Sequence, residues 1–339
     1  MSSNGNLNNG SEAPATASLD SWGKYSDPQA RPSQGLTSEA IRFFTPTYHQ
    51  DTYDAINPRN FNLAGKSVLI TGASKGIGRT TAIRFALAGC SSIAIAARTT
   101  TLLTSLTAEI LSAANEAGHP PPNVLELTLD VSSPSSVESA AKTLSKEFGG
   151  KLDILIANAA ASYDLSQPLA ESDVDGWLNT LTVSLSGTYL CARYFLPLLL
   201  KSTLKTFIGL SSVGALNINA TMSGYQVAKM GVTRLVEFID QGYWRQGVIA
   251  VSIHPGGVDT ELARTLPEEF HGFLVDTPQL AGDWMVWFCD QCKPENGAEE
   301  RKGEWLAGRF VFVNWDVEEL QQRKEEVLEK NLLKFRMAV

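Results

Sequence analysis

The chain has 339 residues and carries 28 Lys and Arg against 36 Asp and Glu, which gives a formal net charge of −8. This acidic balance, without any basic run, argues against nucleic-acid binding. Hydrophobic residues make up 43% of the chain, which is ordinary for a globular protein and too high for disorder throughout. The length suggests about two domains, although one large α/β domain fits as well.

The first segments of the chain differ from the rest in composition. Ser, Asn, Gly and Pro dominate residues 1–36, which predicts a disordered polar tail without the apolar stretch of a secretory signal. Aromatic residues return between positions 37 and 60, at Phe43, Phe44, Tyr48 and Tyr53. We therefore expect residues 37–60 to form an N-terminal extension that packs on the main body.

Short β-branched runs then alternate with amphipathic stretches. Helices are predicted from the first glycine-rich turn to about residue 87, at 100–117 and at 134–148, and strands are predicted at 66–70, 92–97, 124–129, 152–157, 206–210, 248–253 and 309–313. This alternation indicates βαβ units in an α/β fold with a doubly wound parallel sheet. No second alternation pattern exists, so one domain is expected over residues 61–315.

The first predicted strand runs into a glycine-rich turn, Thr71-Gly72-Ala73-Ser74-Lys75-Gly76-Ile77-Gly78. Glycines lack Cβ, so the backbone can approach a pyrophosphate closely, and the next helix offers free N–H groups to that anion. A merely tight turn would also use glycines, but the order of strand, glycines and helix is the context of a dinucleotide site. The predicted cofactor contacts here are Gly72, Ser74, Lys75, Gly76, Ile77 and Gly78.

The end of the second predicted strand distinguishes NAD from NADP. An NAD site places a carboxylate roughly 20 residues past the glycines, where it binds the ribose 2′-OH. Here the sequence reads Ala96-Ala97-Arg98-Thr99, without a carboxylate. Arg98 and Lys75 offer two cations for a 2′-phosphate, which favours NADP(H), although Arg98 alone could be a solvated residue at a strand end.

A Tyr and a Lys stand four positions apart in Tyr225-Gln226-Val227-Ala228-Lys229 and share one face of a helix. We expect Lys229 to lower the pKa of Tyr225, which would make the phenol a usable proton donor or acceptor. Ser212, which precedes Tyr225 by 13 residues at a strand end, could donate a hydrogen bond to a substrate carbonyl. Such a pair also occurs by chance on exposed helices, but its place after the glycine loop favours catalysis.

With these residues the sequence resembles the short-chain dehydrogenase/reductase family over about residues 61–315. The matching motifs are Thr71-Gly72-x3-Gly76-x-Gly78, Asp130-Val131, Asn158-Ala159-Ala160, Ser212, Tyr225-x3-Lys229 and Pro255-Gly256-Gly257-Val258-Asp259-Thr260. The resemblance implies a Rossmann-like fold and hydride transfer to or from nicotinamide.

The same resemblance implies roles for individual residues. Tyr225 would act as acid or base, Lys229 would also bind the nicotinamide ribose, and Ser212 would orient the carbonyl. Asp130, followed by Val131, would contact adenine, and Asn158 would lie near the adenosine ribose. Thr260 would contact the carboxamide from a cofactor loop that also contains Pro255, Gly256 and Val258.

Two positions depart from the family pattern. The motif Asn-Ala-Gly appears as Asn158-Ala159-Ala160, which adds one methyl group near the cofactor. Ser184 stands where the family usually has an Asn that holds a water linking the lysine to bulk solvent. A Ser hydroxyl is shorter and offers fewer groups, so we expect an active enzyme with a slower or rerouted proton relay. The alternative is redox-neutral chemistry.

The flanks carry a second, less specific resemblance. Phe44-Thr45-Pro46-Thr47-Tyr48-His49 before the domain and Gly308-Arg309-Phe310 through Leu320 after it resemble a fungal branch of the family that is associated with secondary metabolism. Residues 316–339 are expected to form a C-terminal helical extension. Its helix, at 317–334, would pack an apolar stripe of Leu320, Val327, Leu328 and Leu332 on the surface of the domain.

The predicted substrate is a mostly apolar small molecule with a ketone or secondary alcohol, such as a polyketide or terpenoid. The segments 160–169, 213–224 and 261–280 follow strand ends and should line its pocket, and residues 261–277 should form a mobile lid. Their side chains carry few charges, although several could simply pack the loops; they include Tyr163, Leu216, Met222, Leu262, Phe270, Phe273 and Leu274. The alternative functions are a redox-neutral isomerase, dehydratase or epimerase, and a non-enzymatic nucleotide-sensing regulator.

Four cysteines are too few and too scattered for a disulfide framework, and Cys289 and Cys292 are expected to be ordinary helix-end residues, with a metal or redox role as the alternative. The most apolar stretch, 188–200, contains Arg193 and is too short to span a membrane, so we expect a cytoplasmic protein. No metal site is predicted. The family resemblance implies a homodimer or homotetramer through the helices at 188–200 and 225–241, although the run 196–200 fits a core helix equally.

Overall fold

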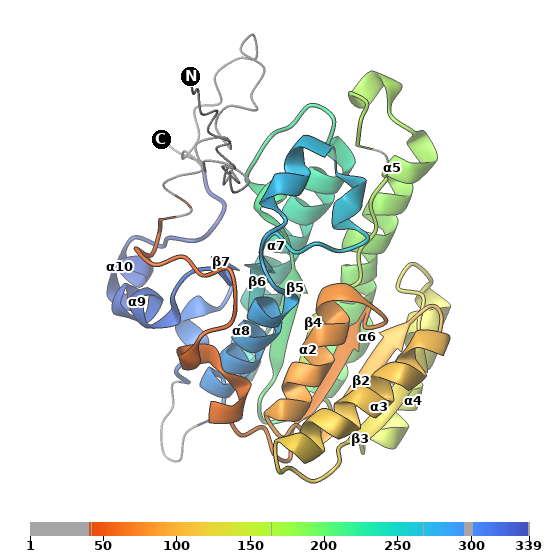
Figure 1. The fold of residues 1–339 in the computed structure, drawn as a ribbon, viewed down its shortest axis with the longest axis vertical. Coiled ribbons are helices and arrows are strands. Elements are labelled where there is room, and N and C mark those ends of the chain that lie inside the picture. Colours follow the sequence, from red (N-terminus) through yellow and green to blue (C-terminus); the bar gives the residue numbers. More distant parts are fainter. Residues whose placement is uncertain (1–40, 42, 164, 267, 295–300, 338–339) are drawn as a thin grey trace, which may run out of the picture.

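A seven-stranded parallel sheet forms the centre of the computed structural model, which describes residues 41, 43–163, 165–266, 268–294 and 301–337 (Figure 1). Its order is β3-β2-β1-β4-β5-β6-β7, so the predicted doubly wound α/β fold is confirmed. The strands are β1 Ser67–Thr71, β2 Ser92–Ala97, β3 Asn123–Thr128, β4 Ile154–Ala157, β5 Thr206–Leu210, β6 Ile249–His254 and β7 Phe310–Phe312. The predicted tail at 1–36 lies outside the described residues.

Helices cover both faces of the sheet because successive strand residues point to opposite sides. Val68 and Ile70 of β1 belong to one buried cluster, with α2, α3 and α8, whereas Leu69 belongs to the other, with α4, α6 and α7. The helices are α2 Gly76–Leu87, α3 Thr101–Glu116, α4 Pro134–Glu147, α5 Val174–Leu181, α6 Gly187–Leu199, α7 Ser223–Tyr243, α8 Pro278–Gln291, α9 Val317–Gln322 and α10 Lys324–Glu329. None of the helices in the described ranges is long and apolar enough to cross a membrane.

The direction of strand addition reverses between β1 and β4. The chain builds β2 and β3 on one side of β1, then crosses over to add β4 through β7 on the other. Loops leaving β1 and β4 therefore diverge at their carboxyl ends, and in open α/β sheets this crevice is where ligands bind. The glycine-rich turn after β1 and Asn158 after β4 both lie at this point.

The N-terminal extension contacts the segment that follows β7. The ring of Phe44 lies 4.9 Å from that of Trp315, and the indole Nε1 of Trp315 donates a hydrogen bond to the carbonyl of Ile41. Thr52 donates to Asp283 of α8 at 2.5 Å, and the buried Asp283 carboxylate pairs with Arg84 of α2. These contacts fix the extension between two helices of the domain and its last strand.

The expectation of one helix over residues 317–334 is wrong. Arg323 separates α9 from α10, because its backbone leaves the helical region and its guanidinium lies 3.8 Å from the centre of the Phe44 ring. The predicted apolar stripe is correct for Leu320 and Val327, which are buried, and Leu332 is partly buried. Leu328 does not belong to it, because 44% of this residue is exposed.

Cys289 lies within α8 and Cys292 directly follows it, and both are buried. Burial raises the pKa of the Cys292 thiol to about 12 and that of Cys289 well above its usual value, so both thiols are protonated at neutral pH. Neutral buried thiols are poor nucleophiles, which agrees with the expectation that these residues are structural.

Candidate active site

The glycine-rich turn is built for close backbone approach. Gly72 and Gly76 have positive φ angles of +67° and +57°, which favour glycine. A Cβ on Gly78 would lie 2.5 Å from the amide nitrogen of Asn158. That amide donates to the carbonyls of Thr71 and Gly72 at 2.8 and 3.1 Å. Asn158 therefore holds the turn against β4, and α2 begins directly at Gly76.

The remaining residues of this turn lie in different surroundings. Ser74 is partly buried, and Ile77 packs against the core cluster on the α2 face of the sheet. Lys75 is exposed and forms an ion pair with Glu261, the residue that follows Thr260. The pair joins the glycine turn to the start of the predicted lid.

Arg98 and Asp130 lie at the carboxyl ends of β2 and β3. Arg98 is exposed. Asp130 accepts hydrogen bonds from the hydroxyl and the backbone N–H of Ser132, at 2.6 and 2.9 Å. These bonds hold the pKa of Asp130 below its usual value, and the positive charge of Arg98 contributes. Val131 is buried and packs against Gly187, where a Cβ would lie 2.7 Å from the Val131 side chain.

Ser212, Tyr225 and Lys229 are brought together where β5 meets α7. Ser212 is the second residue after β5, and its hydroxyl hydrogen-bonds with Tyr225 and accepts from the N–H of Gly214 at 3.0 Å. The ammonium of Lys229 donates to the carbonyl of Leu210 at 2.9 Å and lies 5.8 Å from the centre of the Tyr225 ring. The predicted triad is therefore assembled in space.

The expected direction of the Tyr225 pKa shift is wrong. Burial raises the pKa of Tyr225, and the hydrogen bond to Ser212 reverses this only in part. Burial also lowers the pKa of Lys229, to about 8, because its ammonium is removed from water. Desolvation is the largest cause of both shifts, so Tyr225 is a protonated phenol at neutral pH.

Ser184 lies inside a π-helical turn, Thr182–Ser186, between α5 and α6. Its hydroxyl donates to the carbonyl of Ala161 at 3.2 Å and accepts from the N–H of the same residue at 3.1 Å. Ser184 therefore ties the wide turn to the segment after β4. One acceptor position remains for a water.

The cofactor loop that resembles the family motif, residues 255–260, reaches back to the glycine turn. The methyl group of Thr260 would lie 3.1 Å from a Cβ placed on Gly76. Pro255 and Gly256 are partly buried, and Val258 is buried. The ends of β1 and β6 thus meet across the crevice.

Sequence reasoning missed three residues of the site. His254, at the end of β6, accepts a hydrogen bond from the N–H of Val213, and burial lowers its pKa to about 3. Glu261 binds Lys75, and Asp276 binds the cofactor loop through Gly257. The place of His254 directly before Pro255 was a usable signal. No local signal in the sequence marked Glu261 or Asp276, because their partners lie in turns that are distant along the chain.

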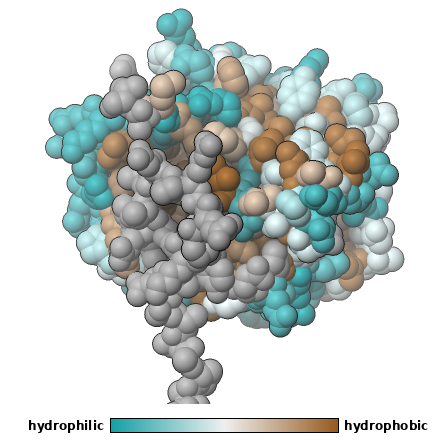
Figure 2. Space-filling view, turned by 90° about the horizontal axis from the view of Figure 1, so that it is seen from above, coloured by the Kyte–Doolittle hydropathy of each residue, from teal (hydrophilic) through white to brown (hydrophobic). Residues whose placement is uncertain are grey.

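Some side chains of the predicted pocket segments pack against one another instead of lining a pocket. Tyr163, Leu165 and Met222 are buried in one cluster, with Trp177, Tyr225, Leu266 and Phe270 packed against it. The alternative that some of these residues pack the loops is thus correct for Tyr163 and Met222. Leu216, Leu262, Phe273 and Leu274 are partly buried. Figure 2, which views the upper end of the molecule in Figure 1, shows hydrophobic patches among polar side chains.

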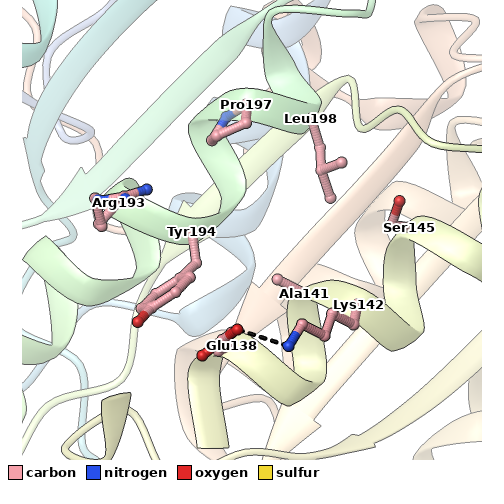
Figure 3. Close-up of a pocket in the computed structure, with 8 residues that line it drawn as sticks. All are labelled: Glu138, Ala141, Lys142, Ser145, Arg193, Tyr194, Pro197 and Leu198. Carbon is pink, nitrogen blue, oxygen red and sulfur yellow. Dashed lines mark ion pairs between the residues drawn. The ribbon is translucent and has the colours of Figure 1, made fainter. Parts of the chain in front are cut away.

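Two hollows lie outside the Ser212–Tyr225–Lys229 cluster. One, of about 410 Å³, lies between α4 and α6 (Figure 3). Glu138 forms an ion pair with Lys142 on the α4 side, and Tyr194 and Pro197 line the α6 side. This hollow contains no predicted site residue. The other, of about 390 Å³, belongs to the lid region and is lined by Asp259, Arg264, His271 and Leu274.

Comparisons with known proteins agree with this geometry. The family model for short chain dehydrogenases matches residues 66–270. A short chain dehydrogenase of Monascus purpureus is 45% identical over 291 residues, which cover 86% of this chain and 95% of that relative. A short chain dehydrogenase of Aspergillus terreus is 38% identical over 291 residues, which cover 84% of this chain and 59% of that relative.

Solved structures show the same fold. An alcohol dehydrogenase of the archaeon Thermococcus sibiricus, complexed with 5-hydroxy-NADP, has a TM-score of 0.56 at 26% identity and covers 65% of this chain and 88% of its own. A 7α-hydroxysteroid dehydrogenase complexed with NADH and a 7-oxo bile acid has a TM-score of 0.62 at 19% identity, with coverage of 78% and 97%. The chain therefore belongs to the short-chain dehydrogenase family of oxidoreductases.

Proposed function

We propose that this protein transfers a hydride between NADP(H) and a ketone or secondary alcohol of a mostly apolar small molecule. The observation that carries the proposal is the hydrogen-bonded pair of Ser212 and Tyr225, with Lys229 one turn further along α7. These groups lie at the edge of the sheet where the glycine turn also lies. A proton donor and a dinucleotide cradle at one edge are what carbonyl reduction requires.

The residues present fit a dinucleotide. The glycine turn leaves backbone surface where a Cβ would collide, and the free N–H groups of α2 point out of its first turn. We assign Gly72, Ser74, Gly76, Ile77 and Gly78 to the pyrophosphate side. Asn158 would act through the turn that it holds. Bound nicotinamide would supply or accept the hydride.

NADP(H), rather than NAD(H), is supported by charge. Arg98 directly follows β2, where an NAD site would have a carboxylate, and Lys75 provides a second cation. The solved relatives include both an NADP analogue and an NADH complex, so the choice rests on these two residues. Asp130 and Val131 would line the adenine side. Pro255, Gly256, Val258 and Thr260 would line the nicotinamide side.

In the reductive direction the protonated hydroxyl of Tyr225 would give its proton to the carbonyl oxygen of a bound ketone. Its raised pKa keeps the phenol protonated and ready to donate at neutral pH. Ser212 would orient the same oxygen, and Lys229 would bind the ribose of the nicotinamide cofactor. Ser184 would support the return of a proton to Tyr225 from solvent.

The substrate class follows from the surroundings of Tyr225. Two partly buried apolar side chains of the predicted lid, Leu266 and Phe270, pack against the same cluster as Tyr225. A small polyketide or terpenoid ketone fits this surface better than a charged metabolite. The fungal relatives are consistent with a place in secondary metabolism.

One observation supports a second candidate. Ser184 replaces the usual Asn and forms two hydrogen bonds with the backbone of Ala161. The proton relay that returns a proton to Tyr225 is therefore weaker than in the family pattern. A redox-neutral isomerase, dehydratase or epimerase would not need it for net turnover. A purely nucleotide-sensing regulator is disfavoured, since Ser212, Tyr225 and Lys229 are all present.

The test follows NADPH absorbance while the protein is offered a panel of apolar ketones. We expect turnover by the wild-type chain and its loss in Tyr225→Phe, which removes the proton donor but leaves the ring and the cofactor affinity. Tyr194→Phe, at the hollow between α4 and α6 that contains no predicted site residue, is the matched control and should keep full activity. Tight NADPH binding without turnover of any ketone or alcohol would favour the redox-neutral alternative. Retained activity in Tyr225→Phe would remove this residue from the acid/base role.

We further propose a cytoplasmic homodimer or homotetramer that associates through α6 and α7. Tyr189, Val227, Met230 and Phe238 expose apolar surface on these helices, with 67% of Phe238 exposed. The run 196–200 does not contribute to this face, because Leu196, Leu198 and Leu199 are buried in the core. Light scattering of the purified protein tests the assembly, and Phe238→Glu should shift it toward the monomer.

A further inference from the structure

Two segments, residues 44–53 and 313–320, lie outside the helices and strands that build the crevice, and the proposed chemistry uses neither. They meet in the folded chain, where Tyr48 and Trp315 form an antiparallel bridge. The N–H of His49 donates to the carbonyl of Asn314 at 2.7 Å. Figure 1 shows this orange-red N-terminal segment beside the blue C-terminal elements.

The end of the predicted lid is clasped to the cofactor loop. The N–H of Gly257 donates to the Asp276 carboxylate at 2.6 Å, and the N–H of Asp276 donates to the carbonyl of Gly257 at 2.9 Å. Gly256 has a φ angle of +89°, and a Cβ there would lie 2.7 Å from the same carboxylate. Gly256 therefore admits the Asp276 side chain against the loop that contains Thr260.

Asn314 connects this clasp to the N-terminal segment. Its amide donates one hydrogen bond to the Asp276 carboxylate at 3.0 Å and another to the carbonyl of His49 at 2.9 Å. Asn314 is fully buried, and only 8% of Asp276 is exposed. Because both partners are acceptors, the amide bridges two segments that are more than two hundred residues apart in the sequence.

The next residues extend the same connection to α8. The N–H of Thr277 donates to the carbonyl of Gln50 at 2.9 Å, and its hydroxyl donates to Asp51 at 2.5 Å. The junction between the lid and α8 is thus held by the N-terminal segment. At the other end of the lid, Glu261 forms the exposed ion pair with Lys75.

We propose that Asp276 and Asn314 are positioning residues for cofactor binding: the flanking segments brace Asp276, and Asp276 fixes the loop 255–260 in the shape that receives nicotinamide. The inference rests on the proposed function, because it gives that loop to the cofactor. A carboxylate that accepts a backbone N–H is a strong, directional partner, and buried groups of this kind hold a loop in one conformation. Segments 44–53 and 313–320 thereby influence how tightly the cofactor binds.

The brace is tested with four variants of the full-length protein. Asp276→Ala removes the clasp, and Asp276→Asn restores an acceptor oxygen for Gly257. Asn314→Leu keeps the volume but removes both donated bonds. Glu319→Gln is the control, because Glu319 binds Thr47 at the exposed outer end of the same flank. Each variant is assayed for its NADPH dissociation constant, its KM and kcat, and amide hydrogen exchange of residues 255–260.

We expect Asp276→Ala and Asn314→Leu to weaken NADPH binding about tenfold, the loss of a charge-assisted hydrogen bond. The KM for NADPH should rise more than kcat falls, and the Gly257 amide should exchange faster. Asp276→Asn should recover most of the affinity, and Glu319→Gln should match the wild type. A folded Asn314→Leu with wild-type affinity and wild-type exchange at Gly257 would overturn the inference.

The two proposals fail in different ways. If the wild-type chain binds no NADPH, the proposed function is wrong, whatever the variants do. If the wild type binds NADPH but Asp276→Asn is as weak as Asp276→Ala, the carboxylate geometry does not position the loop and the brace is merely structural. Should Asp276→Ala fail to fold, the Asn314→Leu and Asp276→Asn pair still decides the matter.

Discussion

The ion pair between Lys75 and Glu261 provides a specific prediction about cofactor choice. If Lys75 binds the 2′-phosphate, it must exchange Glu261 for the phosphate, so Glu261 competes with the cofactor. The exposed side-chain fractions are 59% for Lys75 and 74% for Glu261, and exposed pairs are weak. Removing the competitor by Glu261→Gln should therefore tighten NADPH binding by about two- to fivefold.

The assay is a titration of both NADPH and NADH, followed by tryptophan fluorescence, for the wild type, Glu261→Gln, Lys75→Ala and the double variant. Only NADPH affinity should respond to Glu261→Gln, because NADH lacks the 2′-phosphate. The gain should vanish when Lys75 is already Ala, and it should shrink at high salt, which screens exposed charges. Equal changes for both cofactors, or a gain that persists without Lys75, would refute the exchange.

Three further predictions concern pH and stability. Ketone reduction should decline as the pH rises through about 8, because Lys229 is charged below its pKa and loses its proton above it; a pH profile of kcat/KM that stays flat to higher pH would contradict this. Asp283→Ala should cost about 3–5 kcal/mol of unfolding free energy, since it leaves Arg84 partly buried and unpaired, whereas Asp259→Ala, in an exposed pair, should leave the thermal midpoint unchanged. Ser184→Ala should cost about 1–2 kcal/mol in denaturant unfolding by freeing the peptide of Ala161, with the exposed neighbour Ser186→Ala as the control; equal stability of the two variants would count against this role.

The sheet could be predicted from local pattern because a parallel strand buried on both faces is a short apolar run between polar turns. All seven predicted strands exist, with bounds that differ by at most two residues. The glycine turn and the Tyr225–Lys229 pair were visible for the same reason, since backbone conformation and helical spacing are local properties. The length alone did not separate one domain from two.

Features that depend on contacts between residues far apart in the chain could not be predicted from the sequence. The C-terminal helix breaks at Arg323 because that side chain binds the N-terminal Phe44, nearly three hundred residues away. Three of the seven apolar residues expected in the pocket, Tyr163, Met222 and Phe270, belong to one packed cluster, which the sequence could not distinguish from lining a substrate. The C-terminal helix and the pocket were both predicted wrongly because the packing partner of a side chain is known only in the folded protein.

The sequence by itself predicted the fold class, the glycine turn and the grouping of Ser212, Tyr225 and Lys229, because each depends on spacing along one or two neighbouring elements. The tertiary structure decided the electrostatics of that cluster. Burial raises the pKa of Tyr225 and lowers that of Lys229, and desolvation exists only once the surrounding elements have packed. It also decided the partners of Glu261, Asp276 and Asn314, since each contact joins turns that the chain brings together only on folding.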